Sequence, residues 1–480
     1  MKRKKIFRVA TLVLLFSVLM TTIPAQTTSA NSKNKSASQS TKVNWPKGPS
    51  VGADSAIVMD AKTGLILYSK NIHKKQYPAS ITKIMTTLLA LENCSLSETV
   101  SFSKTAVNIE SGSTHIGIKA GEQLSMQDSL YAIMLNSANE VSNGVAEHIS
   151  GSISEFAKLM TKRAKELGCE DTHFANANGL HDDNHYTSAY DMALISKAAL
   201  QNSTFRSITQ TRRYTIGSTN LEKTKRYMSN HHQMLNPVKY PQYAYEYCIG
   251  GKTGFTNKAR NTLVTFAKKG DMELICVVLK SSPPNVLPNN QYTDTIKLLN
   301  FGFENYTTYN INSQSNGLSL DSSQLFTRYN PLFDKNSSSL QVSGDGYVIL
   351  PNKVKLSEAT KTVTVVKNTE LKDGSNVIGS IVYNYGGKQV GHTDIIYNKS
   401  ASVSLDTSHK INKNDTSDNP LVNLFNNATT SHKVSPLLIL AIVLIIIVIL
   451  VIALIILFQV KKQSFSHRSY RRRNIFRKRF

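Results

Sequence analysis

A serine and a lysine three positions apart, Ser80 and Lys83, lie at the predicted start of a helix that Pro78 marks two residues earlier. On a helix, positions three apart share one side, so the Lys83 amine can approach the Ser80 hydroxyl. A serine hydroxyl becomes a good nucleophile only when a base takes its proton, and a lysine is such a base only when it is neutral. Burial and a second nearby cation both lower the pKa of a lysine. The pair therefore predicts a serine nucleophile, and the helix N-terminus offers backbone N–H groups to a developing oxyanion.

Two further polar segments follow Ser80 along the chain. Ser137-Ala-Asn139 comes 57 residues later, in a loop between two predicted helices. Lys252-Thr-Gly254 comes 115 residues after Ser137, between glycines that let a strand approach a ligand closely. Segments of the same types recur at 32–35, 62–64, 101–104 and 417–419, where they have ordinary structural interpretations. Only the first set gives all three in this order, on a helix, a helix junction and a strand, which is the signature of acyl-serine enzymes of β-lactams and peptidoglycan.

The elements that must position these segments are predicted from the hydrophobic pattern and the capping signals. Strands are predicted at 56–59, 65–68, 261–266 and 273–279. Helices are predicted to begin at Ser125, Ser152 and Ser188, each followed three positions later by an acidic residue, and a last helix is predicted over 291–303. This order indicates an α+β catalytic domain over 51–305.

A smaller region downstream lacks helical signals. Short strand-like runs occur there at 346–350, 361–366 and 380–385, between turn signals. They predict a small all-β domain over 315–399. Residues 31–50 and 400–435 are rich in Ser, Asn and Lys and are expected to be a linker and a flexible stalk.

Both ends of the chain carry targeting signals. Residues 1–30 combine a basic start, a short apolar run and a final Thr-Ser-Ala, which is typical of a secretory signal peptide. Residues 437–458 are apolar and without charge, and at 1.5 Å per residue they span about 33 Å, against a hydrocarbon core of about 30 Å. We expect a transmembrane helix over 437–459, with the basic tail 460–480 in the cytoplasm. The localisation expected is the cell membrane, with a single-pass C-terminal anchor and the catalytic domain on the extracellular, cell-wall side.

The net charge of +24, taken over the whole chain, suggests a polyanion partner, but the charges are unevenly distributed. Five of the 56 basic residues lie in 1–30 and nine lie in 436–480, and neither segment contains an acidic residue. Between them 42 basic residues face 32 acidic ones, a net of +10. The charge therefore reports topology, and no nucleic-acid partner is expected. With 40% hydrophobic residues, wholesale disorder is excluded.

The cysteines and histidines give no metal motif. The four cysteines are Cys94, Cys169, Cys248 and Cys276, and none forms a CxxC pair. Cys276 lies in an apolar run and is expected to be buried. His181 and His185 lie in a loop without the helical pattern of a zinc-ligand pair, and His231-His232 is interpreted as a surface pair. No metal and no cofactor are expected.

With its three segments, the chain resembles the serine-type D-Ala-D-Ala carboxypeptidases, the low-molecular-mass penicillin-binding proteins of the peptidase S11 type. The resemblance covers about residues 50–305. It rests on Tyr77-Pro-Ala-Ser-Ile-Thr-Lys-Ile-Met-Thr86, Asn136-Ser-Ala-Asn139, Phe174-Ala-Asn-Ala-Asn-Gly-Leu180, His185-Tyr-Thr-Ser-Ala-Tyr-Asp-Met-Ala193 and Gly251-Lys-Thr-Gly-Phe-Thr256. It implies a β-lactamase/transpeptidase-like fold, in which a sheet is flanked by helices and joined by a helical subdomain. Glu140 departs from the pattern, where an Asp is usual.

The resemblance also implies roles for the individual residues. Ser80 would attack the carbonyl between two terminal D-alanines, Lys83 would take its proton, and Ser137 would relay a proton to the leaving D-Ala. The substrate-binding residues would be Asn139, Lys252, Thr253, Gly254 and Phe255. Of these, Lys252 and Thr253 would bind the terminal carboxylate, and the backbone N–H groups of Ser80 and Phe255 would form the oxyanion hole. The expected partners are peptidoglycan stem peptides ending in D-Ala-D-Ala, and β-lactams, which mimic that dipeptide.

Three alternatives stay open on the sequence. A D,D-endopeptidase or transpeptidase would use the same residues, because acceptor choice is not readable from the sequence. A class A β-lactamase deacylates with a positioned Glu, whereas the corresponding loop 180–185 contains none, which favours slow deacylation. An inactive wall-binding scaffold with the same fold is the alternative from another class, and the three intact segments argue against it.

Overall fold

The computed structural model describes residues 43–281, 290–311, 340–365 and 372–399. The predicted signal peptide, stalk, transmembrane helix and basic tail lie outside these ranges. Among the residues that the structure describes, no helix is long and apolar enough to cross a membrane.

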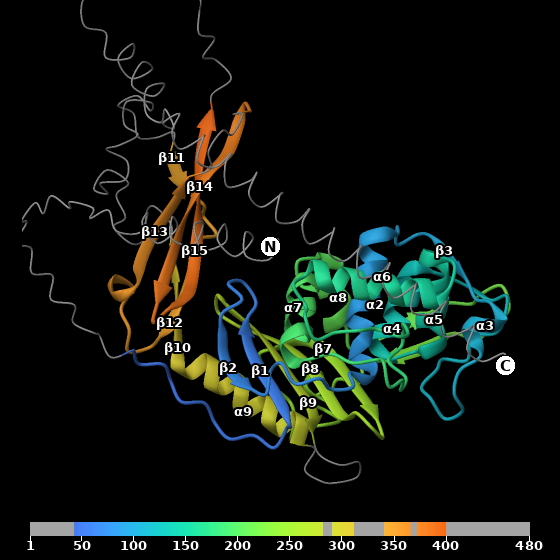
Figure 1. Ribbon diagram of the computed structural model, residues 1–480. Helices are drawn as coiled ribbons and strands as arrows, with labels where there is room; N and C mark the ends of the chain where they lie inside the picture. Colours follow the sequence, from blue (N-terminus) through green and yellow to red (C-terminus); the bar gives the residue numbers. More distant parts are fainter. Residues whose placement is uncertain (1–42, 282–289, 312–339, 366–371, 400–480) are drawn as a thin grey trace, which may run out of the picture. The chain divides into compact units, whose positions relative to one another are not determined.

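A five-stranded antiparallel sheet in the order β2-β1-β9-β8-β7 forms the centre of the catalytic domain (Figure 1). Its strands are β1 (Ser55–Asp60), β2 (Ile66–Lys70), β7 (Cys248–Thr256), β8 (Arg260–Lys269) and β9 (Met272–Ser281). The predicted hairpin and the two predicted later strands are confirmed. β7 is an edge strand, so one of its sides has no strand neighbour among the described residues.

Both faces of the sheet are buried, because successive side chains of a strand point to opposite faces. On β1, Ile57 and Met59 pack into the core of the helical region. The alternate residues Ala56 and Val58 pack into a second core with helix α9 (Asn290–Asn305). Figure 1 shows α9 on one side of the sheet and α7 and α8 on the other.

Three of the helices begin at the predicted capping signals. Their bounds are η1 (Ala79–Thr82), α2 (Lys83–Asn93), α3 (Lys104–Val107), α4 (Met126–Leu135), α5 (Asn139–Ser150), α6 (Ile153–Glu166), α7 (Ala189–Ala199) and α8 (Ser203–Gln210). The side chains of Ser125, Ser152 and Ser188 each accept a hydrogen bond from the backbone N–H three positions later. The helices α3 and α8 and the turn η2 (Gln233–Leu235) were not predicted. Nor were the antiparallel pairs of β3 (Thr99–Ser101) with β4 (Gln123–Ser125) and of β5 (Arg213–Ile216) with β6 (Arg226–Ser229). Their strands of three or four residues are too short to show a clear period.

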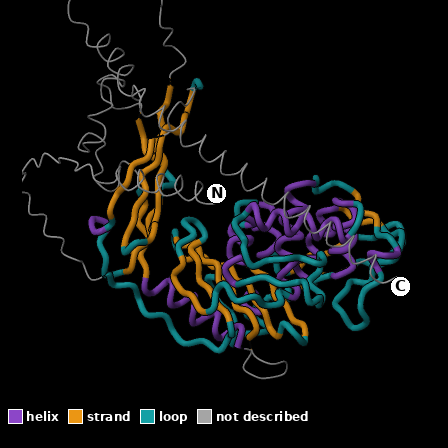
Figure 2. The backbone as a smooth tube through the Cα atoms, viewed as in Figure 1, coloured by secondary structure: helices purple, strands orange, loops and turns teal. Residues whose placement is uncertain are grey.

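A second antiparallel sheet follows α9, in the order β10-β12-β15-β14-β13, with β11 paired to β15. Its elements are β10 (Tyr306–Asn310), β11 (Leu340–Val342), β12 (Tyr347–Pro351), η5 (Leu356–Glu358), β13 (Thr360–Val365), β14 (Gly374–Tyr385) and β15 (Lys388–Lys399). Three of these correspond to the predicted strand-like runs. The sheet also recruits β10, which precedes the predicted start at 315. Figure 2 shows the helices gathered around one group of strands, in agreement with an α+β catalytic domain followed by an all-β part.

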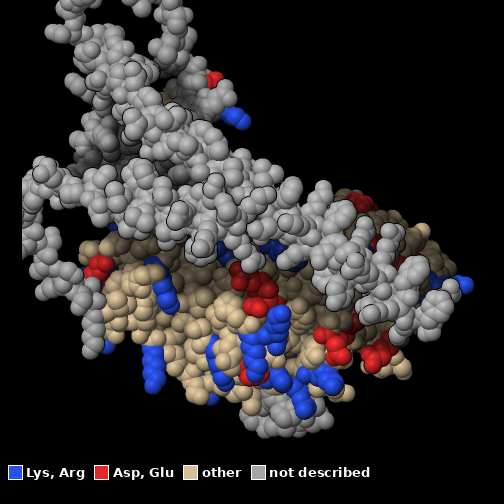
Figure 3. All heavy atoms as spheres, viewed as in Figure 1, with Lys and Arg blue, Asp and Glu red and all other residues tan. Residues whose placement is uncertain are grey.

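Charged side chains of both signs occur on the face of the molecule shown in Figure 3. Lysines and arginines lie there among aspartates and glutamates. This face is therefore not a uniformly basic surface, which agrees with the modest charge excess of the central part of the sequence.

Candidate active site

Ser80 lies in the 3-10 turn η1, and Lys83 is the first residue of α2. Residues three apart eclipse each other in a 3-10 helix, and Lys83 Nζ lies 3.2 Å from Ser80 Oγ. Ala79, directly before the serine, has a φ of 52°, which is costly for a residue with a side chain. The turn is held from β8, where Thr262 Oγ1 donates a 2.8 Å hydrogen bond to the carbonyl of Pro78. Tertiary contacts thus fix the strained turn that presents Ser80.

The amine of Lys83 is fully buried among three oxygen atoms. These atoms are Ser80 Oγ, Asn139 Oδ1, which lies 2.7 Å from Lys83 Nζ, and the backbone carbonyl oxygen of Asn178. The oxygens of Asn139 and Asn178 can only accept, so they satisfy the two N–H bonds of a neutral amine. The amine lone pair is then left for the O–H of Ser80. The geometry therefore suits a lysine that acts as a base.

Two buried lysines face the same region of the site. Burial is the main cause that lowers the pKa of Lys83 well below its usual value; the positive charge of Lys252 adds to it, and Glu140 opposes it. Lys252, on β7, is 1% exposed, and burial lowers its pKa to about 7. Its Nζ donates to the carbonyl of Thr253 at 2.9 Å. The second cation that a neutral Lys83 requires is therefore present, supplied by a strand far away in sequence.

Ser137 and Asn139 lie where α4 gives way to α5. Ser137 has a φ of 58° and is 5% exposed, and Asn139 is the first residue of α5. The backbone N–H of Asn139 donates to the carbonyl of Thr114 at 3.0 Å. A positive φ in a serine is a strained conformation that concentrates at functional sites.

Strand β7 approaches the nucleophile turn closely at Gly254. A Cβ atom at this position would meet the backbone nitrogens of Ser80 at 2.8 Å and of Ile81 at 3.1 Å, so only glycine fits. The next residue, Phe255, is 45% exposed. Since β7 is an edge strand, its free side can pair with an extended peptide.

These residues line one cleft of about 380 Å³. The predicted site residues in its wall are Ser80, Ser137, Asn139, Thr253, Gly254 and Phe255. Lys83 and Lys252 are buried behind this wall and touch it through Ser80, Asn139 and Thr253. The structure thus brings together all eight residues predicted from three distant segments.

The carbonyl of Asn178 is a site group that the sequence reasoning missed. Both ends of the Asn178 side chain are used, because Nδ2 donates to Asn143 Oδ1 at 2.9 Å and Oδ1 accepts from the N–H of Leu180 at 2.8 Å. Gly179 follows with a φ of 86° and leaves no room for a Cβ beside the carbonyl of Ala79. The Asn-Gly pair signals a tight turn, but a backbone carbonyl that faces a lysine has no signature in sequence.

His185 fixes the same loop to the nucleophile turn. Its Nδ1 accepts from the backbone N–H groups of Ala175 at 3.0 Å and Asn176 at 3.3 Å, so Nε2 carries the hydrogen and donates to Thr82 Oγ1 at 2.8 Å. Burial lowers the pKa of His185 to about 3, which keeps the ring neutral. Both ring nitrogens are engaged, which leaves neither for a metal.

The interpretation of His231-His232 as a surface pair is wrong for His232. This ring is 1% exposed, and its Nε2 lies 3.0 Å from Thr265 Oγ1. The sequence shows two adjacent polar residues in a loop, whereas the fold covers one of them with β8. His231 does lie in the wall of the cleft.

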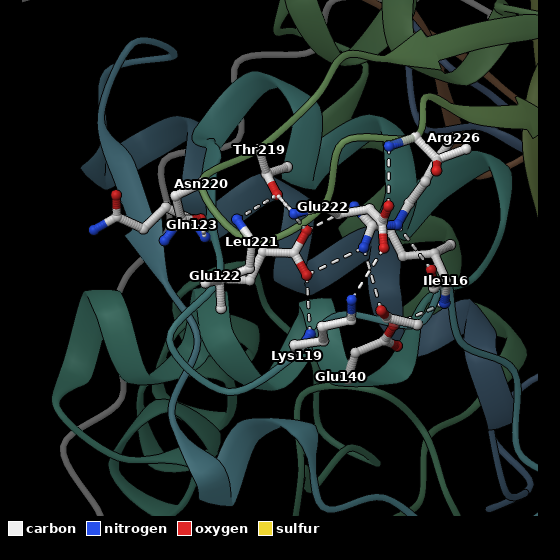
Figure 4. Close-up of polar contacts among 12 residues, drawn as sticks. Ile116, Lys119, Glu122, Gln123, Glu140, Thr219, Asn220, Leu221, Glu222 and Arg226 are labelled. Atoms are coloured by element: carbon white, nitrogen blue, oxygen red, sulfur yellow. Dashed lines mark hydrogen bonds and ion pairs between the residues drawn. The ribbon is translucent and has the colours of Figure 1, made fainter.

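Residues 112–114 form a further part of the cleft wall, and the network in Figure 4 reaches Ile116, two residues further along the chain. Arg226 and the fully buried Glu122 form an ion pair at 2.7 Å. The guanidinium also donates to the carbonyl of Ile116 at 3.0 Å, while the N–H of Ile116 donates to Glu140 Oε1 at 2.7 Å. Because Glu140 follows Asn139 in α5, the network joins this part of the wall to the Ser137–Asn139 segment.

Comparison with known proteins places these features in a family context. The family model described as "D-alanyl-D-alanine carboxypeptidase", Peptidase S11, matches residues 40–282. The chain is 37% identical over 262 residues to the D-alanyl-D-alanine carboxypeptidase DacF of Bacillus subtilis. The aligned region covers 54% of this chain and 64% of the relative, so the chain matches just under two thirds of the length of DacF. It is 28% identical over 361 residues to the D-alanyl-D-alanine carboxypeptidase DacC of Escherichia coli, and the aligned region covers 73% of this chain and 84% of the relative. Its fold is similar to that of penicillin binding protein 5 from Haemophilus influenzae, with a TM-score of 0.55 and 25% identity over 74% of this chain and 99% of that one.

Proposed function

The chain belongs to the peptidase S11 family of D-alanyl-D-alanine carboxypeptidases, and from this we propose that it removes the terminal D-alanine from peptidoglycan stem peptides through an acyl-serine intermediate. The observation that carries the proposal is the buried amine of Lys83, 3.2 Å from Ser80 Oγ and close to the second buried lysine. Burial and the charge of Lys252 favour the neutral amine, which is the form that can take the proton of Ser80.

In the acylation step, Ser80 Oγ bonds to the carbonyl carbon of the D-Ala-D-Ala peptide bond as its proton passes to Lys83 Nζ. The ammonium then keeps its hydrogen bonds to Asn139 and to the carbonyl of Asn178, which are acceptors already in place. The backbone N–H groups of Ser80 and Phe255 donate to the oxyanion. When the C–N bond breaks, the Ser137 hydroxyl relays a proton to the leaving D-alanine.

Recognition of the leaving residue rests on β7. Lys252 and Thr253 bind the terminal carboxylate, and the free side of this edge strand accommodates the peptide backbone together with Asn139. A β-lactam presents a carboxylate and a strained amide to the same groups and acylates Ser80. Water then hydrolyses the peptide acyl-enzyme, whereas the loop 180–185 offers no glutamate to speed release of a penicilloyl group.

The proposal is tested by mass spectrometry of muropeptides incubated with the purified chain. We expect pentapeptide stems to lose one terminal alanine while cross-linked dimers persist. Cleavage of the dimers identifies an endopeptidase, new dimers identify a transpeptidase, and many turnovers of penicillin identify a β-lactamase. Unchanged muropeptides together with no covalent penicillin label identify an inactive scaffold and overturn the proposal.

We further propose that the chain is held in the cell membrane by its C-terminal segment, with the catalytic domain on the cell-wall side. The support is the apolar run 437–458 and the basic tail that follows it. Truncation before Leu437 is expected to release active enzyme into the soluble fraction. Retention of the truncated chain in the membrane fraction contradicts a single anchor.

A further inference from the structure

Three side chains of different chemistry meet away from the cleft, namely Cys94, Glu98 and His148. Their ligand atoms all lie within 4.8 Å of one another, and His148 Nε2 is 2.9 Å from Glu98 Oε2. Thiolate, imidazole and carboxylate are the three ligand types that zinc takes in proteins, and such mixed N, S and O sets suit it better than the hard cations Mg²⁺ and Ca²⁺. We propose that these three residues form a zinc site, with water as the fourth ligand.

The backbone between the first two ligands is already ordered for this task. The N–H of Cys94 donates to the carbonyl of Ala90 at the end of α2. A tight turn follows, in which Glu98 N–H donates to the carbonyl of Ser95 at 3.1 Å and Ser95 N–H donates to Glu98 Oε1 at 2.6 Å. The second bond orients the carboxylate, so that Oε2 faces His148 in the metal-free chain and is available to the metal once the His148 contact is released. A fixed outer partner of this kind raises the precision of a metal ligand.

The local field also favours a cation. Cys94 is the C-cap of α2, and His148 lies in the last turn of α5, which ends at Ser150. The C-terminal end of a helix carries partial negative charge, and here two such ends accompany a carboxylate. On binding, the Cys94 thiol releases its proton to solvent. The imidazole of His148 exchanges its Nε2 proton for one on Nδ1 through solvent, so that the neutral ring can donate its Nε2 lone pair.

The site joins the far ends of the two helices that serve the cleft. Lys83 begins α2 and Asn139 begins α5, and these two side chains share a hydrogen bond at 2.7 Å. At 1.5 Å per residue, the 11 residues of α2 separate the two ends by about 16 Å. None of the three ligands lines the cleft. The zinc therefore stabilises the helix pair from its opposite end and takes no part in acylation.

The test uses the full-length, tag-free chain in detergent, freed of metal with a chelator and titrated with Zn²⁺ and, as a spectroscopic probe, with Co²⁺. We expect one equivalent to bind, a thiolate-to-Co²⁺ charge-transfer band in the near ultraviolet, and a higher unfolding temperature with Zn²⁺. Cys94→Ser should abolish the band, and Cys94→Ser and His148→Ala should each weaken binding at least about tenfold. Glu98→Gln provides a third variant in case either of these fails to fold.

Two matched controls separate the site from general thiol and histidine binding. Cys248→Ser removes another partly buried thiol, and His73→Ala removes another histidine that faces a carboxylate, at 3.3 Å from Asp171. Both variants should bind metal as the wild type does. The proposal is overturned if the chain binds no stoichiometric metal, if the ligand variants bind as tightly as the controls, or if the Co²⁺ band survives in Cys94→Ser. Acylation by penicillin is measured in parallel and should not change on removal of zinc, so failure here is distinct from failure of the proposed activity.

Discussion

Two Ser-x-x-Lys segments occur among the residues that the structure describes, and their surroundings differ completely. Lys83 is fully buried against Ser80, Asn139 and the carbonyl of Asn178. In the other segment, Lys104 is exposed at the start of α3, and Ser101 accepts a hydrogen bond from Gln123 Nε2 at 3.1 Å. The comparison teaches that the spacing supplies a hydroxyl and an amine, whereas desolvation and neighbouring charge decide whether the amine can be a base.

The largest expected effect comes from the replacement of Ser80, with Ser101 as the matched control. Ser80→Ala removes the nucleophile, so the rate of acylation by fluorescent penicillin should fall by on the order of 10⁵ or more. Ser101→Ala should label at the wild-type rate. Residual rapid labelling of the Ser80→Ala variant would show that another residue is the nucleophile.

Replacement of the two lysines by arginine separates charge from basicity. A guanidinium keeps its proton in proteins, so Lys83→Arg should retain a cation but lose the base, with a fall of about 10³-fold in acylation rate. Lys104→Arg should leave the rate unchanged. Circular dichroism checks that both variants are folded. If folded Lys83→Arg acylates as fast as wild type, Lys83 is not the base.

The pH dependence of acylation is expected to follow the protonation states of both buried lysines, Lys83 and Lys252. The rate should rise as Lys83 loses its proton, at a pH below that of an ordinary lysine, and fall as Lys252 loses its proton, near its pKa of about 7. Above that value the wild-type kcat/KM should drop about tenfold per pH unit. Lys252→Arg should move this alkaline limb upward, because its cation persists to about pH 12. An alkaline limb that stays in place in Lys252→Arg assigns it to another group.

A smaller effect is expected from the network in Figure 4, beside the cleft wall. Glu122→Gln leaves Arg226 without its counter-charge and should cost about 2–3 kcal/mol of unfolding free energy in urea, less than for a fully buried pair because the Arg226 side chain is 11% exposed. The acylation kcat/KM should fall about tenfold as the link from Arg226 through Ile116 to Glu140 loosens.

The matched control is the ion pair between Lys119 and Glu222, at 3.1 Å, which lies at the more exposed edge of the same network. Glu222→Gln breaks an ion pair that solvent screens, and such pairs contribute little to stability. The variant should leave acylation unchanged. Equal effects of Glu122→Gln and Glu222→Gln on stability and rate would rule out a positioning role for the buried pair.

The sequence by itself determined the features that depend on near neighbours. The side chains of Ser125, Ser152 and Ser188 cap their helices as predicted, because an N-cap is satisfied within three residues. The hairpin at β1 and β2 was equally readable from its turn. The order of the three polar segments also sufficed to predict the family and the eight residues that the cleft brings together.

Only the tertiary structure decided the chemistry of those residues. The pKa of Lys83 is lowered by burial and by Lys252, 169 residues later, and the Lys83 amine also donates to the carbonyl of Asn178. The burial of His232 and the meeting of Cys94 and His148 depend likewise on which elements pack together. The physical reason is that desolvation and electrostatic coupling act through space over a few ångströms. The sequence names the groups, and the packing of the helices against the sheet sets the distances between them.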